Sequence, residues 1–144
     1  MKSRSFEKSF ATVATVAVIA GIVAGFWVLG TPGRQRSIAS DQRRLNHLQE
    51  TASTLYWRAQ DQGDSYTLPE TLSASELGKD PITQQPYEYT RLSDDTYELC
   101  AEFETDSSTY SLRNRPADDA ERWDHPEGRH CFEFKLSEQP PSFY

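Results

Sequence analysis

The chain has 144 residues, of which 22 are acidic and 15 are lysine or arginine, so its formal net charge is −7. Five basic residues and one acidic residue fall in residues 1–36, which leaves a net charge of −11 on residues 37–144. This acidic part is long enough for one modest hydrophobic core. It lacks the basic footprint of a nucleic-acid-binding domain, and an anionic bilayer surface would repel it. We therefore expect no nucleic-acid partner.

Residues 10–30 form an apolar run that contains no charged side chain. As a helix this run would be about 30 Å long, which matches the hydrocarbon core of a bilayer. A cleaved signal peptide has a shorter apolar core, of about 7 to 15 residues, with a small-residue cleavage site after it. The run therefore predicts one uncleaved transmembrane helix, with a cytoplasmic tail at residues 1–9. A linker is expected at residues 31–36, because Pro32 removes a helix donor and Gly33 loosens the backbone.

Residues 37–62 predict an amphipathic second helix that ends before Gly63. Its apolar residues recur at helical spacing and would form one stripe, made of Ile38, Leu45, Leu48, Ala52, Leu55 and Ala59. The stripe is typical of a helix that packs on a core, and a self-associating coiled-coil seam is the alternative. His47 lies beside the stripe, where we expect a surface polar residue rather than a metal ligand.

The next segment predicts a loop with a short helical turn, then a tight turn and a hairpin. Pro69 is expected to start the helical turn. Asp80 and Pro81 are expected to set the tight turn, because aspartate accepts hydrogen bonds from nearby backbone N–H groups and proline fixes φ. The first strand of the hairpin opens with a proline, where the missing N–H does least harm, and carries two tyrosines on one side. These three residues are Pro86, Tyr87 and Tyr89.

The two cysteines predict a disulfide bond between the second strand of the hairpin and the last strand of the chain. Apolar and polar side chains alternate in residues 97–103 and 130–136, and Cys100 and Cys131 fall on the polar faces, where we expect them to be solvated. If the strands pair antiparallel with the cysteines opposite each other, the two apolar rows face one core. The facing apolar pairs would be Leu99 with Phe132 and Tyr97 with Phe134. Two unrelated surface thiols are the alternative.

The disulfide also predicts the orientation of the chain in the membrane. Basic residues lie on both sides of the apolar run, so the excess of positive charge expected on the cytoplasmic side does not decide between the two orientations. A disulfide requires an oxidising compartment. We therefore expect a single-pass protein of the inner membrane, with its N-terminus in the cytoplasm and residues 37–144 in the periplasm or outside the cell.

The segment from Thr105 to Arg129 is a long polar loop that ends in a turn before the last strand. Trp123 is expected to fold back on the sheet edge as an apolar anchor. Four aspartates of the loop are weak candidates for a calcium site, because calcium prefers oxygen ligands: Asp106, Asp118, Asp119 and Asp124. A solvated acidic loop is the alternative. His125, His130 and Asp124 match no standard transition-metal spacing.

No motif of the chain indicates catalysis. The sequence contains no glycine-rich phosphate loop, no H-E-x-x-H and no G-x-S-x-G. Both cysteines are assigned to the disulfide, and nothing argues for a cleft with paired carboxylates. We expect neither an enzyme nor a cofactor.

In element order and in two motifs the chain resembles type IV pilin-like domains, most closely the major pseudopilin of type II secretion. That family has a membrane helix, a long amphipathic helix, a G-x-Y-P turn, a D-P-x-x-x-P-Y-x-Y segment and a small antiparallel sheet. Residues 63–69 loosely match the turn. The D-P segment matches closely, allowing for one added residue, at Asp80, Pro81, Pro86, Tyr87 and Tyr89.

Residues 41–134 are still more similar to a group of uncharacterised bacterial membrane proteins. Their outside domain reads L-P, D-P-x-T-x-x-x-Y-x-Y, Y-x-L-C-A-x-F and W-x-H-x-x-G-x-x-C-F. The first motif ends here at Pro69, and the last corresponds to Trp123, His125, Gly128, Cys131 and Phe132. The resemblance implies a pilin-like α+β fold: a transmembrane helix, then a long amphipathic helix packed on a small antiparallel sheet of about three strands. It carries no known activity.

The chain departs from pilins at the N-terminus. A prepilin cleavage site is a glycine followed by F-T-L-I-E, with the glutamate inside the apolar helix. Here Glu7 precedes the apolar run and the first glycine is Gly21. The sequence therefore favours a membrane-anchored binding or scaffolding domain with an unknown protein partner in the envelope. A divergent minor pseudopilin of a type II secretion or type IV pilus-like system is the alternative.

Overall fold

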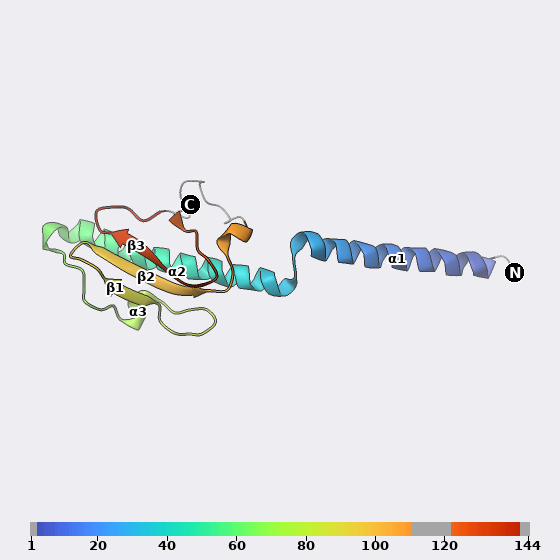
Figure 1. The fold of residues 1–144 in the computed structure, drawn as a ribbon, viewed down its shortest axis with the longest axis horizontal. Coiled ribbons are helices and arrows are strands. Elements are labelled where there is room, and N and C mark those ends of the chain that lie inside the picture. The colour runs from blue at the N-terminus through green and yellow to red at the C-terminus, as the bar shows by residue number, and fades with distance from the viewer. Residues whose placement is uncertain (1–2, 111–121, 142–144) are drawn as a thin grey trace. The chain divides into compact units, whose positions relative to one another are not determined.

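The computed structural model describes residues 3–110 and 122–141 and has an α+β fold. Its main elements in chain order are α1 (Ser3–Leu29), α2 (Pro32–Gln62), α3 (Ala74–Leu77), β1 (Glu88–Arg91), β2 (Thr96–Phe103) and β3 (Gly128–Lys135) (Figure 1). Short 3₁₀ turns occupy Gly63–Ser65 and Ser107–Thr109. The chain divides into two units, Met1–Arg36 and Ser37–Tyr144.

The first unit contains α1, which is long and apolar enough to cross a membrane. Its large side chains are exposed, among them Val16, Ile19 and Val23, so they have no protein core to pack on. The helix begins at Ser3 and extends into the segment expected to be a tail, because neither proline nor glycine interrupts residues 3–20. It ends before Gly30, whose φ of 77° is left-handed and favours glycine.

The linker expected at residues 31–36 is wrong, because α2 already begins at Pro32. A proline at the first helical position costs little, since its missing N–H would have no partner within the helix and its fixed φ is already helical. Gly33 is likewise accommodated in the first turn. Proline and glycine therefore mark a boundary between two helices here and not an extended connection.

The second unit packs α2 against one face of a three-stranded antiparallel sheet, in the order β1-β2-β3 (Figure 1). In the β2–β3 register, Cys100 faces Cys131, Leu99 faces Phe132 and Tyr97 faces Phe134, as the sequence predicts. The apolar stripe of α2 supplies the other side of the core. The buried residues of this stripe are Leu45, Leu48, Ala52 and Leu55. The stripe is therefore a core face and not a coiled-coil seam.

The short helix does not form where the sequence predicts it. It occupies Ala74–Leu77, and Pro69 lies in an irregular segment before it. The helix begins after Ser73, whose backbone N–H donates to the carboxylate of Glu76 at 3.1 Å. This is half of a capping box, a sequence signal for a helix start that the S-x-x-E spacing of Ser73 and Glu76 carries. Leu77 is the buried residue of this helix.

Candidate functional site

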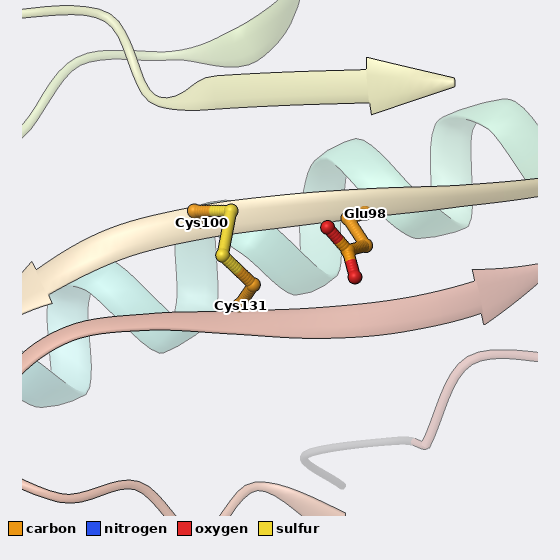
Figure 2. A group of neighbouring side chains, drawn as sticks. All are labelled: Glu98, Cys100 and Cys131. Carbon is orange, nitrogen blue, oxygen red and sulfur yellow. A yellow bond between two sulfur atoms is a disulfide. The ribbon is translucent and has the colours of Figure 1, made fainter. Parts of the chain in front are cut away.

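The disulfide lies on the face of the sheet turned away from α2 and joins β2 to β3 (Figure 2). Cys100 is nevertheless only 2% exposed, so the expectation that it sits on a solvated face is wrong. β2 is the central strand, and the residues facing Cys100 are Glu88 on β1 and Cys131 on β3. The guanidinium of Arg129 also covers it, with 3.5 Å between Nη2 and the Cys100 sulfur. Neighbouring strands thus hide a small residue even on a polar face.

Glu98 brings a carboxylate close to the two sulfurs, so that one oxygen and both sulfurs lie within 4.8 Å of one another (Figure 2). Such a group would resemble a metal site if the sulfurs were thiolates. Thiolates are the metal-binding form of cysteine, and here both sulfurs are consumed by the disulfide. The oxidised protein therefore uses this cluster as a covalent link between strands.

A buried group of charged residues joins α2 to the D-P turn and to the end of β2. Asp41 and Arg44, both fully or almost fully buried, form an ion pair of 2.6 Å across one turn of α2. Arg44 also donates to both carboxylate oxygens of Asp80, which is 6% exposed. Asp41 accepts in addition from the backbone N–H of Glu104 at 3.0 Å and from the hydroxyl of Thr105 at 2.6 Å. We call Asp41, Arg44 and Asp80 the buried charge network.

Asp80 has two structural roles at once. One of its carboxylate oxygens accepts the backbone N–H groups of Ile82 and Thr83, each at 2.8 Å, as the sequence predicts for a turn. Burial alone would raise the pKa of Asp80, but the hydrogen bonds from Arg44, Thr83 and Ile82 outweigh burial and lower this pKa to about 2. Burial likewise opposes the charge of Arg44, and its hydrogen bonds to Asp80 and Asp41 raise the pKa of the guanidinium above its ordinary value. Both groups therefore stay ionised at neutral pH.

Asp41 and Arg44 do not stand out in the sequence as site residues, because their charge suggests a solvated face. Their spacing carries the missing signal: they are four residues before Leu45 and Leu48, so they fall on the same face of the helix as the apolar stripe. A charged pair inside an apolar stripe must find buried partners. The aspartate of the D-P turn is one of them.

The two tyrosines of the hairpin tie it to both neighbouring segments. The hydroxyl of Tyr87 is 3.0 Å from Nδ1 of His47 on α2. The hydroxyl of Tyr89 donates to the carbonyl of Pro69 at 2.8 Å. Burial raises the pKa of both tyrosines, so both hydroxyls keep their proton. His47, expected to be a surface residue, is instead half-buried and hydrogen-bonded to Tyr87.

The W-x-H-x-x-G block closes the other end of the sheet. Trp123 is buried against Phe132, with ring centroids 5.0 Å apart, so its predicted role as an apolar anchor is confirmed. His125 stacks on Phe103 at 3.8 Å, and its backbone N–H donates to the hydroxyl of Ser107. Burial lowers the pKa of His125, which favours the neutral ring.

Gly128 begins β3 with a φ of 100°, a left-handed value that disfavours residues with a side chain. Nδ1 of His125, three residues earlier, donates to the carbonyl of Pro126 at 3.2 Å. The block therefore sets the turn that leads into the last strand.

Two of the four calcium candidates lie in the part of the chain that the structure describes, and each is hydrogen-bonded to a serine of the same loop. Asp106 accepts hydrogen bonds from the backbone N–H and the hydroxyl of Ser108, at 2.8 and 2.6 Å. Asp124 accepts from the hydroxyl of Ser107 at 3.2 Å. Asp118 and Asp119 lie outside the described residues. Both described aspartates therefore act within their own loop.

Two hollows border the outer side of α2. The first, of about 370 Å³, separates α2 from α3 and is lined by His47, Thr51, Arg58, Glu76 and Lys79 among others. The second lies farther round the helix, is lined by Glu50, Ser53, Thr54, Trp57, Arg58 and Asp61, and shares three residues with the first. Basic and acidic side chains both reach the first hollow, where Arg58 pairs with Glu76 at 2.8 Å.

Comparison of the chain with models of protein families, with curated proteins and with solved structures finds no match. The function must therefore be argued from the chain itself.

Proposed function

We propose that the protein is a single-pass membrane protein whose C-terminal unit is a binding or scaffolding module of the bacterial envelope. The N-terminus lies in the cytoplasm, the helix spans the inner membrane, and residues 37–144 lie in the periplasm or outside the cell. The proposal rests on one observation, that two features occur together in this chain. A helix with a charge-free apolar run precedes a folded unit that a disulfide closes.

The charges of the unit support the same function. A net charge of −11 on residues 37–144 keeps the unit soluble and away from an anionic bilayer surface. The motif residues that could have served a reaction hold the fold together instead: Asp80 binds Arg44, and His125 stacks on Phe103. Such a unit is suited to present a rigid surface to a protein partner rather than to act on a substrate.

A divergent minor pseudopilin is the second candidate, because a long helix packed on a small antiparallel sheet is the arrangement that the resemblance to pilin-like domains implies. The N-terminus argues against it. A pilin subunit docks through a new amine that a glutamate in the neighbouring apolar helix neutralises, and an unpaired charge in lipid is costly. Residues 10–30 contain no charged residue, so this pairing has no partner here.

Two measurements test the proposal. A C-terminal reporter that is active only in an oxidising compartment should be active, and a silent reporter in a well-expressed fusion would overturn the topology. Intact mass of the membrane-extracted protein should show Met1 or Lys2 as the N-terminus. A chain that begins near Phe6 or Phe10, or recovery of the protein in sheared fibres, would replace this proposal with the pseudopilin.

A further inference from the structure

Trp57 is the large apolar residue of the second unit that the described structure exposes most. Its side chain is 61% exposed, compared with 59% for Ile82 and 48% for Leu92. It lies on α2 but outside the apolar stripe that packs on the sheet, and its ring contact is an edge-on arrangement with the adjacent Tyr56 at 5.2 Å. Packing of the core therefore does not account for an indole at this position.

A single exposed apolar side chain is common on protein surfaces, so the surroundings of Trp57 decide its meaning. Glu50 lies two turns before Trp57 and Asp61 one turn after it, and all three line the same open groove. Neither carboxylate forms an ion pair with any residue that the structure describes. The basic residue nearest in sequence, Arg58, is already paired with Glu76. The groove thus combines an uncovered indole with two unpaired negative charges.

This combination fits one kind of side chain. An arginine guanidinium is planar, stacks on an indole face and donates hydrogen bonds to carboxylates from its edge. A cation over a tryptophan ring gains about 0.5 to 1 kcal/mol at exposed sites and more where water is excluded. Tryptophan and arginine are also the residues that contribute most often to the centre of protein interfaces.

We propose that the face of α2 formed by Glu50, Trp57 and Asp61 binds an arginine-bearing segment of a protein partner. One guanidinium stacks on the indole of Trp57 and donates to the carboxylate of Asp61, one turn further along α2. A second arginine of the segment donates to Glu50, which lies about 10 Å before Trp57 along the helix at roughly 1.5 Å per residue. Charge complementarity selects the partner, since the whole unit carries a net charge of −11 and two of its unpaired acidic groups lie in this groove. The inference rests on the proposed function of the unit as a binding module and names its surface and the chemistry of its partner.

Two other occupants fit the face less well. A membrane surface would present anionic headgroups to Glu50 and Asp61, and the like charges would repel. Trp57 also lies about 30 Å along α2 from Ser37, where the second unit begins, at roughly 1.5 Å per residue. A second copy of the chain would bring the same acidic face or another part of an acidic unit. A basic segment of a different protein is therefore the occupant that the charges favour.

The test measures binding of a defined probe to the purified full chain in a neutral detergent or nanodisc. The probe is a fluorescent peptide with three arginines spaced by glycine and serine, and the control probe replaces each arginine with uncharged citrulline. Trp57→Ala and the double variant Glu50→Gln/Asp61→Asn should each weaken binding of the arginine peptide at least fivefold. The citrulline peptide should bind no variant measurably.

Matched variants separate the site from the general charge of the unit. Glu127→Gln/Glu133→Gln removes the same charge from two exposed carboxylates elsewhere, and Leu92→Ala removes another exposed apolar side chain. Both controls should change the affinity less than twofold. Equal binding by wild type and Trp57→Ala, or an equal loss in the control pair, would overturn the inference. So would self-association of the chain that Trp57→Ala abolishes, since the occupant would then be a second copy.

The peptide measurement does not depend on where the unit lies in the cell. A silent C-terminal reporter together with intact peptide binding would overturn the proposed function and leave the binding face. An active reporter together with peptide binding that ignores Trp57 would overturn the binding face and leave the proposed function.

Discussion

Replacement of Arg44 by methionine is the sharpest test of how this fold is held together. Methionine keeps much of the length of the side chain and removes its charge and all of its donors. In the wild type these donors reach Asp41, Asp80 and, at 3.3 Å, Glu104. The variant would leave the carboxylates of Asp41 and Asp80 buried without their cation, while Glu104 is exposed enough to find water.

The expected loss follows from this geometry. Removing one partner of a buried ion pair typically costs about 3 to 5 kcal/mol, because the remaining charge is left uncompensated. Two carboxylates lose their cation here, so we expect the free energy of unfolding to fall by at least about 3 kcal/mol. Arg43→Met is the control, because Arg43 is the adjacent residue and is exposed. A surface substitution of this kind usually changes stability by less than about 0.5 kcal/mol.

The effect of pH has a definite sign. In the wild type the pKa of Asp80 is lowered to about 2, so its contribution is present above the unfolded pKa of 3.8 and is lost as the pH falls toward 2. Without Arg44, burial opposes ionisation of Asp80, and protonation removes the cost of burying an unpaired negative charge. The difference in stability between wild type and Arg44→Met should therefore narrow as the pH falls from 7 to 3.

The assay is urea unfolding of the full chain in mild detergent, followed by near-ultraviolet circular dichroism at pH 7 and at pH 3. This signal reports the packed aromatic core of the second unit and not the helix content of α1. If Arg44→Met were within about 1 kcal/mol of Arg43→Met at pH 7, the buried charge network would not be what holds α2 to the D-P turn. A stability difference between wild type and Arg44→Met that is larger at pH 3 than at pH 7 would contradict the assignment of the charges.

Three further predictions concern the disulfide, the buried His125 and the turn at Gly128. Cys100→Ser should lower the free energy of unfolding by about 2 to 5 kcal/mol, and intact mass of the wild type should rise by about 2 Da on reduction. His125→Gln should flatten the pH dependence of stability: burial lowers the pKa of His125, so its contribution is present above about pH 6.5 and is lost as the pH falls through the folded value. Gly128→Ala should lower stability in a urea titration, because the φ of 100° strains any residue with a Cβ.

The sequence predicts the pairing of β2 with β3 well, because the cysteines and the apolar residues require the same register. The alternation in β2 and β3 places the cysteines opposite each other in the same register that places Leu99 on Phe132. The apolar stripe of α2 was equally plain. Periodicity carries this information because burial is decided by which face of an element a residue occupies.

The errors have physical reasons as well. Pro32 predicts a break in the helix, although a proline at the first position of a helix is tolerated. Cys100 was expected in solvent, because an alternating pattern shows which face a residue is on and not what neighbouring strands place over it. Asp41 and Arg44 were overlooked because their partner, Asp80, is far away in the chain. Such a contact depends on the tertiary packing of the turn against the helix, which a local sequence pattern does not show.

The positions of the motif residues also limit which side chains can contact a partner. The motif residues that carry the resemblance are mostly buried or bonded inside the unit: Asp80 to Arg44, Tyr89 to Pro69, Trp123 on Phe132. A side chain used in this way cannot also contact a partner, so the motif accounts for the fold and leaves recognition to residues outside it. Trp57 belongs to no motif and is exposed beside two unpaired carboxylates. The motif residues therefore hold the architecture together, and the binding that we propose lies outside them, on the outer face of α2.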